Sequence, residues 1–331
     1  MTPDYLENIL SDTYYLNEYF DLYIREPGQR FEYIYREEDL YLQFKSIKRH
    51  IKSVCGTTIE DELYDLETPY GYGGPVSNSN DNAFLLRGVR EYKKHCQLQN
   101  IVSEFIRFHP FNSLSGNALL FDMHSFDRDT VVVDLACLSD ERRKKYSKTT
   151  RNIVKKASGR LSVGSNNVPE KDFFELYCLT MEKNNAESFY YFDKEYFRQL
   201  KQLDSTYLNG VFLDGQLVAA GFFMLGKEIA HYHLSANNPD FAKENGNYLL
   251  LDYGFELAKN FGLRYMMLGG GRTALPGDNL LAFKKKFSKS VLPFHIGGLD
   301  FMPEKRSELN KIWLDNNPGV AKPHRFQLYR T

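Results

Sequence analysis

The stretch TYLNGVFLDGQLVAAGFFMLGKEIAHYHLSAN, residues 206–237, constrains the fold of this chain more than any other segment. Two alternating apolar runs flank the pair Asp214-Gly215, and Asp-Gly between such runs is a strong signal for a two-residue hairpin turn. A second turn is expected at Gly226. The stretch therefore predicts three antiparallel strands in a meander, and the third strand places His231 and His233 on one face.

Further helices and strands are expected on both sides of the meander. Upstream lie a short strand in GRLSVGSN and two helices, PEKDFFELYCLTMEKNNA and DKEYFRQLKQL. Downstream lie the helix GNYLLLDYGFELAKNFG, closed by Gly262, and the strand LRYMML. A helix over 279–288 and a last strand pair around VLPFHIGGLDFM complete the C-terminal half of the chain. The order β-αα-βββ-α-β-α-β predicts an α/β (α+β) fold with a mixed sheet.

The N-terminal half reads as a fainter copy of the same pattern. FEYIYREEDLYLQF and SIKRHIKSVC predict paired strands, NDNAFLLRGVREYKKHCQLQ a helix, and IVSEFIRFHP and TVVVDLA further strands. A chain of 331 residues is long enough for two domains. We therefore predict an N-terminal domain over 1–138, a basic helical connector over 139–158 and a C-terminal domain over 159–331.

Composition excludes several functional classes. The net charge of −1 argues against a general nucleic-acid binder, so stable DNA binding is not expected. No apolar run is long enough for a transmembrane segment, and the acidic N-terminus does not resemble a signal peptide, so we expect a cytoplasmic protein. The four cysteines form no C-x-x-C pair, and no metal is expected. The stretch GGGRTALPGDNLL, residues 269–281, lacks both the P-loop and the dinucleotide-binding spacing.

The order helix, meander, helix, strand, helix, strand resembles the GNAT acyltransferase fold. Three segments, TPYGYGGP (68–75), RKKYSKTTRNIVKKA (143–157) and FKKKF (283–287), are similar to the FemAB-like and BioF2-like branch of that superfamily. The resemblance implies two tandem GNAT-like domains, of which the N-terminal one is degenerate. Known members of the FemAB group transfer amino acids onto peptidoglycan precursors.

The resemblance also implies where a coenzyme would bind. In GNAT enzymes the pyrophosphate of coenzyme A lies on the loop that opens the helix after the meander, where exposed backbone N–H groups at a helix N-terminus bind an anion. The corresponding stretch here is KENGNY. Tyr248 stands where a small residue is expected and would crowd a phosphate, and a plain loop is the structural alternative. The candidates for binding acetyl-CoA or another acyl-CoA are Lys243, Asn245, Gly246 and Asn247.

Four residues are candidates for the chemistry. His231 or His233 would take a proton from the attacking amine, unless it is only hydrogen-bonded within the sheet. Lys284 is the counterpart of the lysine that, in Fem-type ligases, lies near the transferred acyl carbonyl; a cation there would stabilise the developing negative charge. The structural alternative is a solvated surface lysine. Tyr191 would protonate the leaving group, unless it packs in the core.

The candidates for substrate binding lie on several segments. The basic segment predicts one helix from Ser139 to Gly159 with a cationic face that lacks acids, and the resemblance places this region near a nucleotide-linked acceptor. Its best candidates are Lys148 and Arg151; a solvated helix face is the alternative. The other candidates are two loop tyrosines suited to stacking, two residues sharing one strand face, a tyrosine before the second helix and an arginine beside the glycines: Tyr70, Tyr72, Arg107, His109, Tyr190 and Arg272.

Together these features predict an N-acyltransferase. It would move an acyl group from acetyl-CoA or another acyl-CoA to an amine on a nucleotide- or lipid-linked sugar or a cell-envelope precursor, at the inner face of the membrane where that substrate is lipid-linked. One alternative is a FemAB-type ligase that uses aminoacyl-tRNA to extend a peptidoglycan precursor. The other is a non-catalytic RNA- or nucleotide-binding protein on the same fold.

Overall fold

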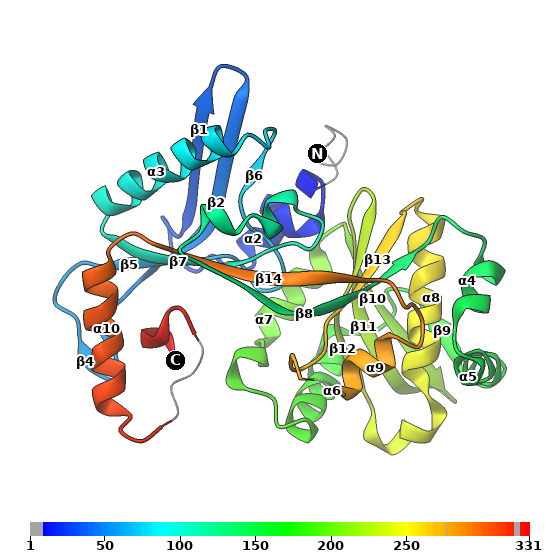
Figure 1. The fold of residues 1–331 in the computed structure, drawn as a ribbon. Coiled ribbons are helices and arrows are strands. Elements are labelled where there is room, and N and C mark those ends of the chain that lie inside the picture. The colour runs from blue at the N-terminus through cyan, green and yellow to red at the C-terminus, as the bar shows by residue number, and fades with distance from the viewer. Residues whose placement is uncertain (1–8, 276, 321–324) are drawn as a thin grey trace. The chain divides into compact units, whose positions relative to one another are not determined.

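The computed structural model describes residues 9–275, 277–320 and 325–331 (Figure 1). These residues form two compact units. The first unit contains residues 23–127 and the described part of 293–331, and the second contains residues 10–22 and 128–292. The predicted domain boundaries at 138 and 158 stay a prediction, but the basic segment between them lies inside the second unit.

The second unit is built on a mixed sheet with the strand order β8-β13-β12-β11-β10-β9. β12 and β13 pair in parallel, and the other neighbours pair antiparallel. Its strands are β8 (Met123–Asp134, shared with the first unit), β9 (Ser162–Gly164), β10 (Thr206–Leu213), β11 (Gln216–Leu225), β12 (Ile229–Asn237) and β13 (Tyr265–Gly269). Its α-helices are α2 (Asn17–Asp21), α4 (Ser139–Lys145), α5 (Lys148–Ser158), α6 (Glu170–Lys183), α7 (Lys194–Gln202), α8 (Gly246–Asn260) and α9 (Asn279–Lys284), joined by the 3₁₀ turns η1 (Thr13–Tyr15), η4 (Ser188–Tyr190) and η5 (Pro239–Glu244). The mixed α/β fold is confirmed.

The meander forms as the sequence predicts. Asp214 and Gly215 adopt φ values of 48° and 81°, the left-handed pair that a tight hairpin turn requires. Helix α8 packs on the meander at Gly254, where a Cβ would lie 2.1 Å from Cε1 of Phe223. The helix can therefore approach β11 closely, and its buried leucines join the core of the unit.

In the first unit, strands of the mixed sheet follow the order β1-β2-β5-β7-β14. Its strands are β1 (Arg30–Glu37), β2 (Leu40–His50), β5 (Tyr64–Glu67), β6 (Val76–Ser77), β7 (Ile101–Arg107) and β14 (Val291–Asp300), with a small ribbon of β3 (Ser53–Val54) and β4 (Thr57–Thr58). Its helices are α3 (Asn82–Leu98) and α10 (Pro303–Asn316), and its 3₁₀ turns are η2 (Ser113–Gly116), η3 (Ala118–Leu120) and η6 (Leu328–Arg330). Asp81 caps α3 by accepting hydrogen bonds from the backbone N–H groups of Ala83 and Phe84.

Three sequence predictions were wrong in detail. The basic segment forms two helices, α4 and α5, because Ser147 caps a new helix by accepting a hydrogen bond from the Thr150 N–H at 3.1 Å. The expected last strand pair is the single strand β14, which pairs with the distant β7, and the following helix α10 was missed. Helix α9 ends at Lys284 rather than at Ser288. In the described part of the chain, no helix is long and apolar enough to cross a membrane.

Candidate active site

A glycine turn follows β13 in the second unit and leads to α9. A Cβ on Gly271 would lie 2.4 Å from Oδ1 of Asp278, and one on Gly270 would lie 2.7 Å from Cδ of Arg128. These positions therefore accept only glycine without a local shift. The glycines thus let the chain pass closely by an acid and an arginine of the same unit.

Asp278 organises this turn. Its Oδ1 caps α9 by accepting the Leu281 N–H at 2.8 Å, and its Oδ2 accepts the N–H groups of Arg272 and Thr273 at 2.9 and 3.1 Å. Burial opposes the ionised form, but these backbone hydrogen bonds outweigh burial, and the pKa of Asp278 lies below its usual value. The sequence analysis did not select Asp278, although an Asp directly before an amphipathic helix is an N-cap signal.

Lys284 lies inside the same turn. Only 7% of the residue is exposed, and its Nζ donates a hydrogen bond to the Gly270 carbonyl oxygen at 2.7 Å. Burial lowers the pKa of Lys284 to about 7; the carboxylate of Asp278 opposes this shift and Arg128 adds to it. The lysine is thus buried and able to change its charge near neutral pH.

Arg128 completes the turn from β8. Its Nη1 donates to the carbonyl oxygens of Gly271 and Arg272, both at 2.8 Å. Sequence patterns gave no reason to select it, because 143 residues separate it from the glycine it contacts. Arg272, which was selected, directs its Nη2 to the Asn184 side chain at 2.6 Å.

The two histidines of β12, His231 buried and His233 partly buried, lie in a polar cluster of the second unit. His231 Nε2 and Asp12 Oδ2 are 2.6 Å apart. The ring of His233 lies between two hydroxyls: Tyr14 OH is 2.9 Å from Nδ1 and Tyr196 OH is 2.9 Å from Nε2. Burial, with His231 as a second cause, lowers the pKa of His233 to about 3, so this ring stays neutral. The arrangement favours the structural alternative for His233.

The loop with the coenzyme candidates opens helix α8. Asn245 adopts a left-handed conformation with φ 58°, and its Nδ2 donates to the Lys243 carbonyl oxygen instead of capping the helix. Asn247 keeps its side-chain Oδ1 buried without a hydrogen-bond partner among the described residues. Gly246 is buried, and a Cβ there would lie 2.7 Å from Cγ1 of Val218. No side chain among the described residues caps the first turn of α8, where the Tyr248 N–H donates to the Asn245 carbonyl oxygen at 3.0 Å.

The side chain of Tyr248 is held by other residues and does not lie free across this loop. Its ring packs edge-on against Phe283, with centroids 5.1 Å apart, and its hydroxyl lies 2.9 Å from Nζ of Lys286. The tyrosine thus joins α8 to the segment around α9. The sequence analysis treated it only as an obstacle to a phosphate and missed this packing role.

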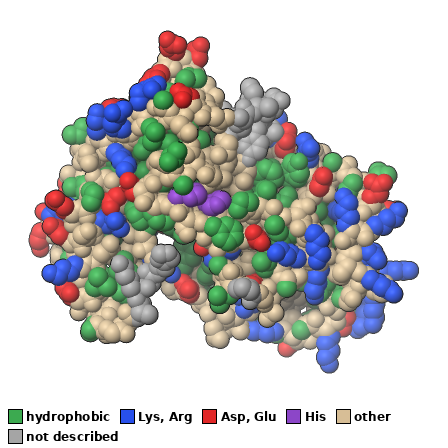
Figure 2. All heavy atoms as spheres, viewed as in Figure 1, with side chains coloured by type: hydrophobic (Ala, Val, Ile, Leu, Met, Phe, Trp, Pro, Cys, Tyr) green, Lys and Arg blue, Asp and Glu red, His purple; other side chains and the backbone are tan. Residues whose placement is uncertain are grey.

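Acidic residues from a distant part of the chain lie beside part of the basic segment. Arg142 and Arg143 donate to Glu256 and Asp252 of α8, with Nη2 to carboxylate distances of 2.7 and 2.8 Å. These two arginines lie outside the predicted cationic face, and the sequence did not show their pairing because the acids are more than a hundred positions away in the chain. The exposed cations of α5 are Lys148, Arg151, Lys155 and Lys156. Figure 2 shows Lys and Arg side chains gathered where Figure 1 places α4 and α5.

The tyrosine pair before α7 is partly exposed. Tyr191 is 44% exposed, and the Tyr190 carbonyl oxygen accepts a hydrogen bond from Tyr177 OH at 2.8 Å. Tyr191 is therefore not the core residue that the structural alternative required, and its proposed role as an acid stays a prediction.

Comparison with known proteins agrees with this geometry. The family model for the acetyltransferase (GNAT) domain matches residues 143–285, which include Lys284. The resemblance to GNAT acyltransferases is confirmed. No curated protein matches the chain.

Solved structures share the fold of this chain over most of its length. FemX is 12% identical with a TM-score of 0.68, covering 92% of this chain and 96% of its own. L-PGS from Bacillus licheniformis is 13% identical with a TM-score of 0.55, covering 92% of this chain and 94% of its own. The C-terminal domain of a putative lysylphosphatidylglycerol synthetase from Agrobacterium fabrum is 13% identical with a TM-score of 0.54, covering 94% of this chain and 95% of its own.

The remaining candidates lie in the first unit, outside the GNAT match. Arg107 donates from Nη1 to the Thr68 carbonyl oxygen at 2.9 Å, and His109 accepts the Phe111 N–H at Nδ1 at 3.1 Å. The ring of Tyr72 is buried against His109, with centroids 5.4 Å apart. The structure therefore brings Tyr72 and His109 together. Tyr70 is half-buried in the same loop, and its role as a stacking residue stays a prediction.

Proposed function

We propose that this chain is an N-acyltransferase whose second unit transfers an acyl group to an amine. The observation that supports this most is the setting of Lys284, which is buried and donates to the Gly270 carbonyl oxygen at 2.7 Å. With its pKa lowered to about 7, a large share of the lysine is charged at neutral pH. A cation held in a dry turn stabilises the negative charge that develops on an acyl carbonyl oxygen. A solvated surface lysine has neither this burial nor this shift.

The proposed donor is acetyl-CoA or another acyl-CoA. Support comes from the uncapped first turn of α8, which offers backbone N–H groups at the positive end of a 15-residue helix. The packing of Tyr248 against Phe283 also supports this donor, since the ring is held by α9. The proposed contacts of the pyrophosphate are with Lys243, Asn245, Gly246 and Asn247.

The proposed acceptor is an amine on a bulky anionic molecule, such as a nucleotide- or lipid-linked sugar or a cell-envelope precursor. The exposed cations Lys148 and Arg151 on α5 would attract its phosphates. His231, held by Asp12, is our candidate for accepting the proton of the attacking amine. Transfer breaks the thioester bond of the donor and forms an amide bond, and the thiolate leaves with a proton.

A second function is supported by the FemX likeness, which covers nearly the whole chain. In this alternative the donor is aminoacyl-tRNA and the acceptor a peptidoglycan precursor. The name of the Agrobacterium protein describes the synthesis of lysylphosphatidylglycerol, which also supports an aminoacyl group as the group transferred.

Thermal unfolding with and without acetyl-CoA tests the donor. The proposal expects a saturable rise in Tm, since a ligand that binds only the folded state stabilises it. Lys243→Glu should abolish the rise, whereas Lys171→Glu on α6, an exposed lysine of the same unit, should keep it. No rise at millimolar acetyl-CoA excludes this donor.

A transfer assay and an RNA-binding measurement then separate the remaining functions. Transfer of a labelled aminoacyl group from tRNA, lost in Lys284→Met, establishes the ligase. RNA binding that weakens steeply with salt, without transfer from either donor, establishes the non-catalytic binder.

A further inference from the structure

A groove in the first unit lies between α3 and residues 119–122, and none of its lining residues is among those proposed for transfer. It has a volume of about 380 Å³, within the range of small-molecule sites. Its lining residues are Leu86, Val89, Arg90, Lys93, Lys94, Gln97, Leu119, Leu120, Phe121 and Asp122. All of them belong to one unit, so the groove is complete within it.

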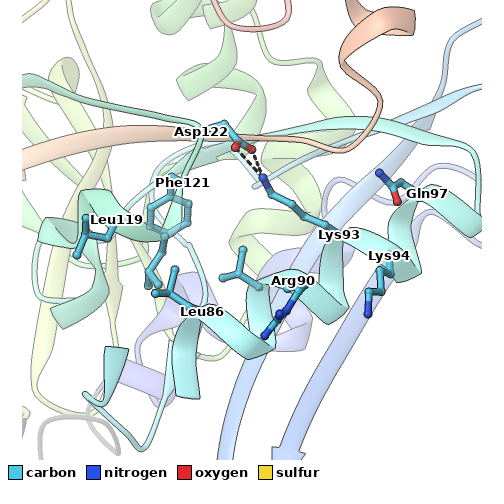
Figure 3. A pocket seen from close by; sticks show the side chains of 10 residues that line it. Leu86, Arg90, Lys93, Lys94, Gln97, Leu119, Phe121 and Asp122 are labelled. Atoms are coloured by element: carbon cyan, nitrogen blue, oxygen red, sulfur yellow. Dashed lines mark hydrogen bonds and ion pairs between the residues drawn. The ribbon is translucent and has the colours of Figure 1, made fainter. Parts of the chain in front are cut away.

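The two ends of the groove differ in character. Figure 3 shows Leu86, Leu119 and Phe121 at one end and Lys94 and Gln97 at the other. On α3, Leu86, Arg90 and Lys94 follow each other at intervals of four residues, so one helix face passes from apolar to cationic. A ligand that fills the groove would need an apolar part and an anionic part.

The apolar end is preformed. Val89 and Leu120 are buried, and the ring of Phe121 packs edge-on against Phe108 with centroids 4.8 Å apart. Above this floor Leu86 and Leu119 remain 45% and 71% exposed. Covering these two leucines with a hydrocarbon chain would remove apolar surface from water, while the floor loses no freedom.

The cationic end has positive charge that is available to a ligand. Lys93 is held by Asp122, with Nζ 2.6 and 2.5 Å from its two carboxylate oxygens. Among the residues that the structure describes, none forms a hydrogen bond or ion pair with the exposed guanidinium of Arg90. In the described part of the chain, the one ion-pair partner of Lys94 is the partly exposed Glu91, one turn earlier on the helix, at 2.8 Å. An exposed pair of this kind contributes little, so a ligand carboxylate can compete for Lys94.

We propose that this groove binds a medium-chain aliphatic carboxylate from solution. Its chain lies over Val89 and Leu120 between Leu86 and Leu119, and its carboxylate pairs with Arg90 and Lys94. Arg90 gives the geometry its specificity, because its planar guanidinium can hold both oxygens of a carboxylate. The groove shares no residue with the turn of Lys284, so the two proposals can be tested independently.

Calorimetric titration of the full chain with decanoate, below its micelle concentration, tests this proposal. Saturable binding is expected, weakened about tenfold or more by Arg90→Ala, the loss expected for a charge-assisted contact. Leu119→Asp should weaken it at least as much. Because both side chains are exposed, neither change should lower Tm much.

Matched controls separate the groove from general surface effects. Lys311→Ala removes an exposed cation of α10 in the same unit, and Leu98→Asp changes a leucine at the end of α3 that is 87% exposed and does not line the groove. Both should bind decanoate normally. Decyltrimethylammonium and acetate, which lack the anion and the chain respectively, should not bind. Binding that survives Arg90→Ala and Leu119→Asp, equal binding of the cationic amphiphile, or no saturation overturns the proposal.

Discussion

The Nζ of Lys284 lies 2.7 Å from the carbonyl oxygen of Gly270, so the last residue of α9 points into the turn that ends β13. The lysine is buried in order to make this contact, and burial lowers its pKa. It also fixes the cation beside a segment where glycines allow close approach. The relationship makes Lys284 the first residue to test.

Lys284→Met should lower the rate of acyl transfer by ~10²–10³, the usual loss when one oxyanion donor is removed. Lys285→Met, which loses only a partly exposed pair with Asp129, should change the rate little. Because the cation is the active form, the rate of the unmodified protein should fall as pH rises above about 7, and the residual rate of Lys284→Met should not. Steady-state kinetics over pH 5–9 checks both.

The pH dependence of stability tests the lowered pKa of Lys284 independently of the transfer rate. Its pKa is lower in the folded state than in the unfolded chain, so this group destabilises the fold below pH 7 and the cost disappears as pH rises toward 10.5. Lys284→Met should therefore raise Tm at pH 6 more than at pH 10. An unchanged rate together with a raised Tm would show that the lysine has no part in catalysis.

Gly271→Ala should disturb the turn, because the new Cβ would lie 2.4 Å from Oδ1 of Asp278. Either the Asp278 cap or the backbone must move, and we expect a cost of about 1–3 kcal/mol in the free energy of unfolding together with slower transfer. Urea denaturation measures the first effect. Gly116→Ala is the control, since a Cβ there meets nothing within 4 Å; equal costs at both positions would contradict the close approach.

His233 should have a structural role. Its pKa of about 3 keeps it neutral from pH 5 to 9, so it should contribute no limb to the rate–pH profile. Tyr196→Phe removes one hydroxyl from the ring and should cost about 1 kcal/mol of stability with little change in rate. A His233→Gln variant that keeps its Tm but loses transfer more than a hundredfold would instead make His233 a catalytic base.

Glu104 should make the stability of the first unit depend on pH. Burial raises its pKa to about 7, although hydrogen bonds from the hydroxyls of Ser46 and Tyr92 oppose the shift. The folded state thus holds a proton that the unfolded chain releases, so the contribution of this group is full below about pH 4.5 and is lost as pH rises through 7.

Replacing the acid with an amide tests this account of Glu104. Glu104→Gln should raise Tm at pH 8 and flatten its dependence on pH between 5 and 8, measured by calorimetry. Glu304→Gln, at an exposed glutamate of α10, should leave the pH dependence unchanged. A steep dependence that persists in Glu104→Gln would assign it to another group.

The sequence by itself determined the local structure of the second unit. Asp214-Gly215 fixed the hairpin and Gly262 the end of α8, because turns and helix ends depend on backbone preferences of a few neighbouring residues. The order of these elements was then sufficient to indicate the GNAT fold. The resemblance of FKKKF to Fem-type ligases also indicated Lys284 as a candidate, although not its surroundings.

Only the tertiary structure decided the electrostatics of the sites. It paired Arg142 with Glu256, gave His231 its partner Asp12 and placed Arg128 on the glycine turn. It also paired β14 with β7 rather than with a neighbour in the chain. These contacts join residues more than a hundred positions apart. Burial and charge pairing depend on distance in space, whereas periodicity and turn signals report only on residues close together in the sequence.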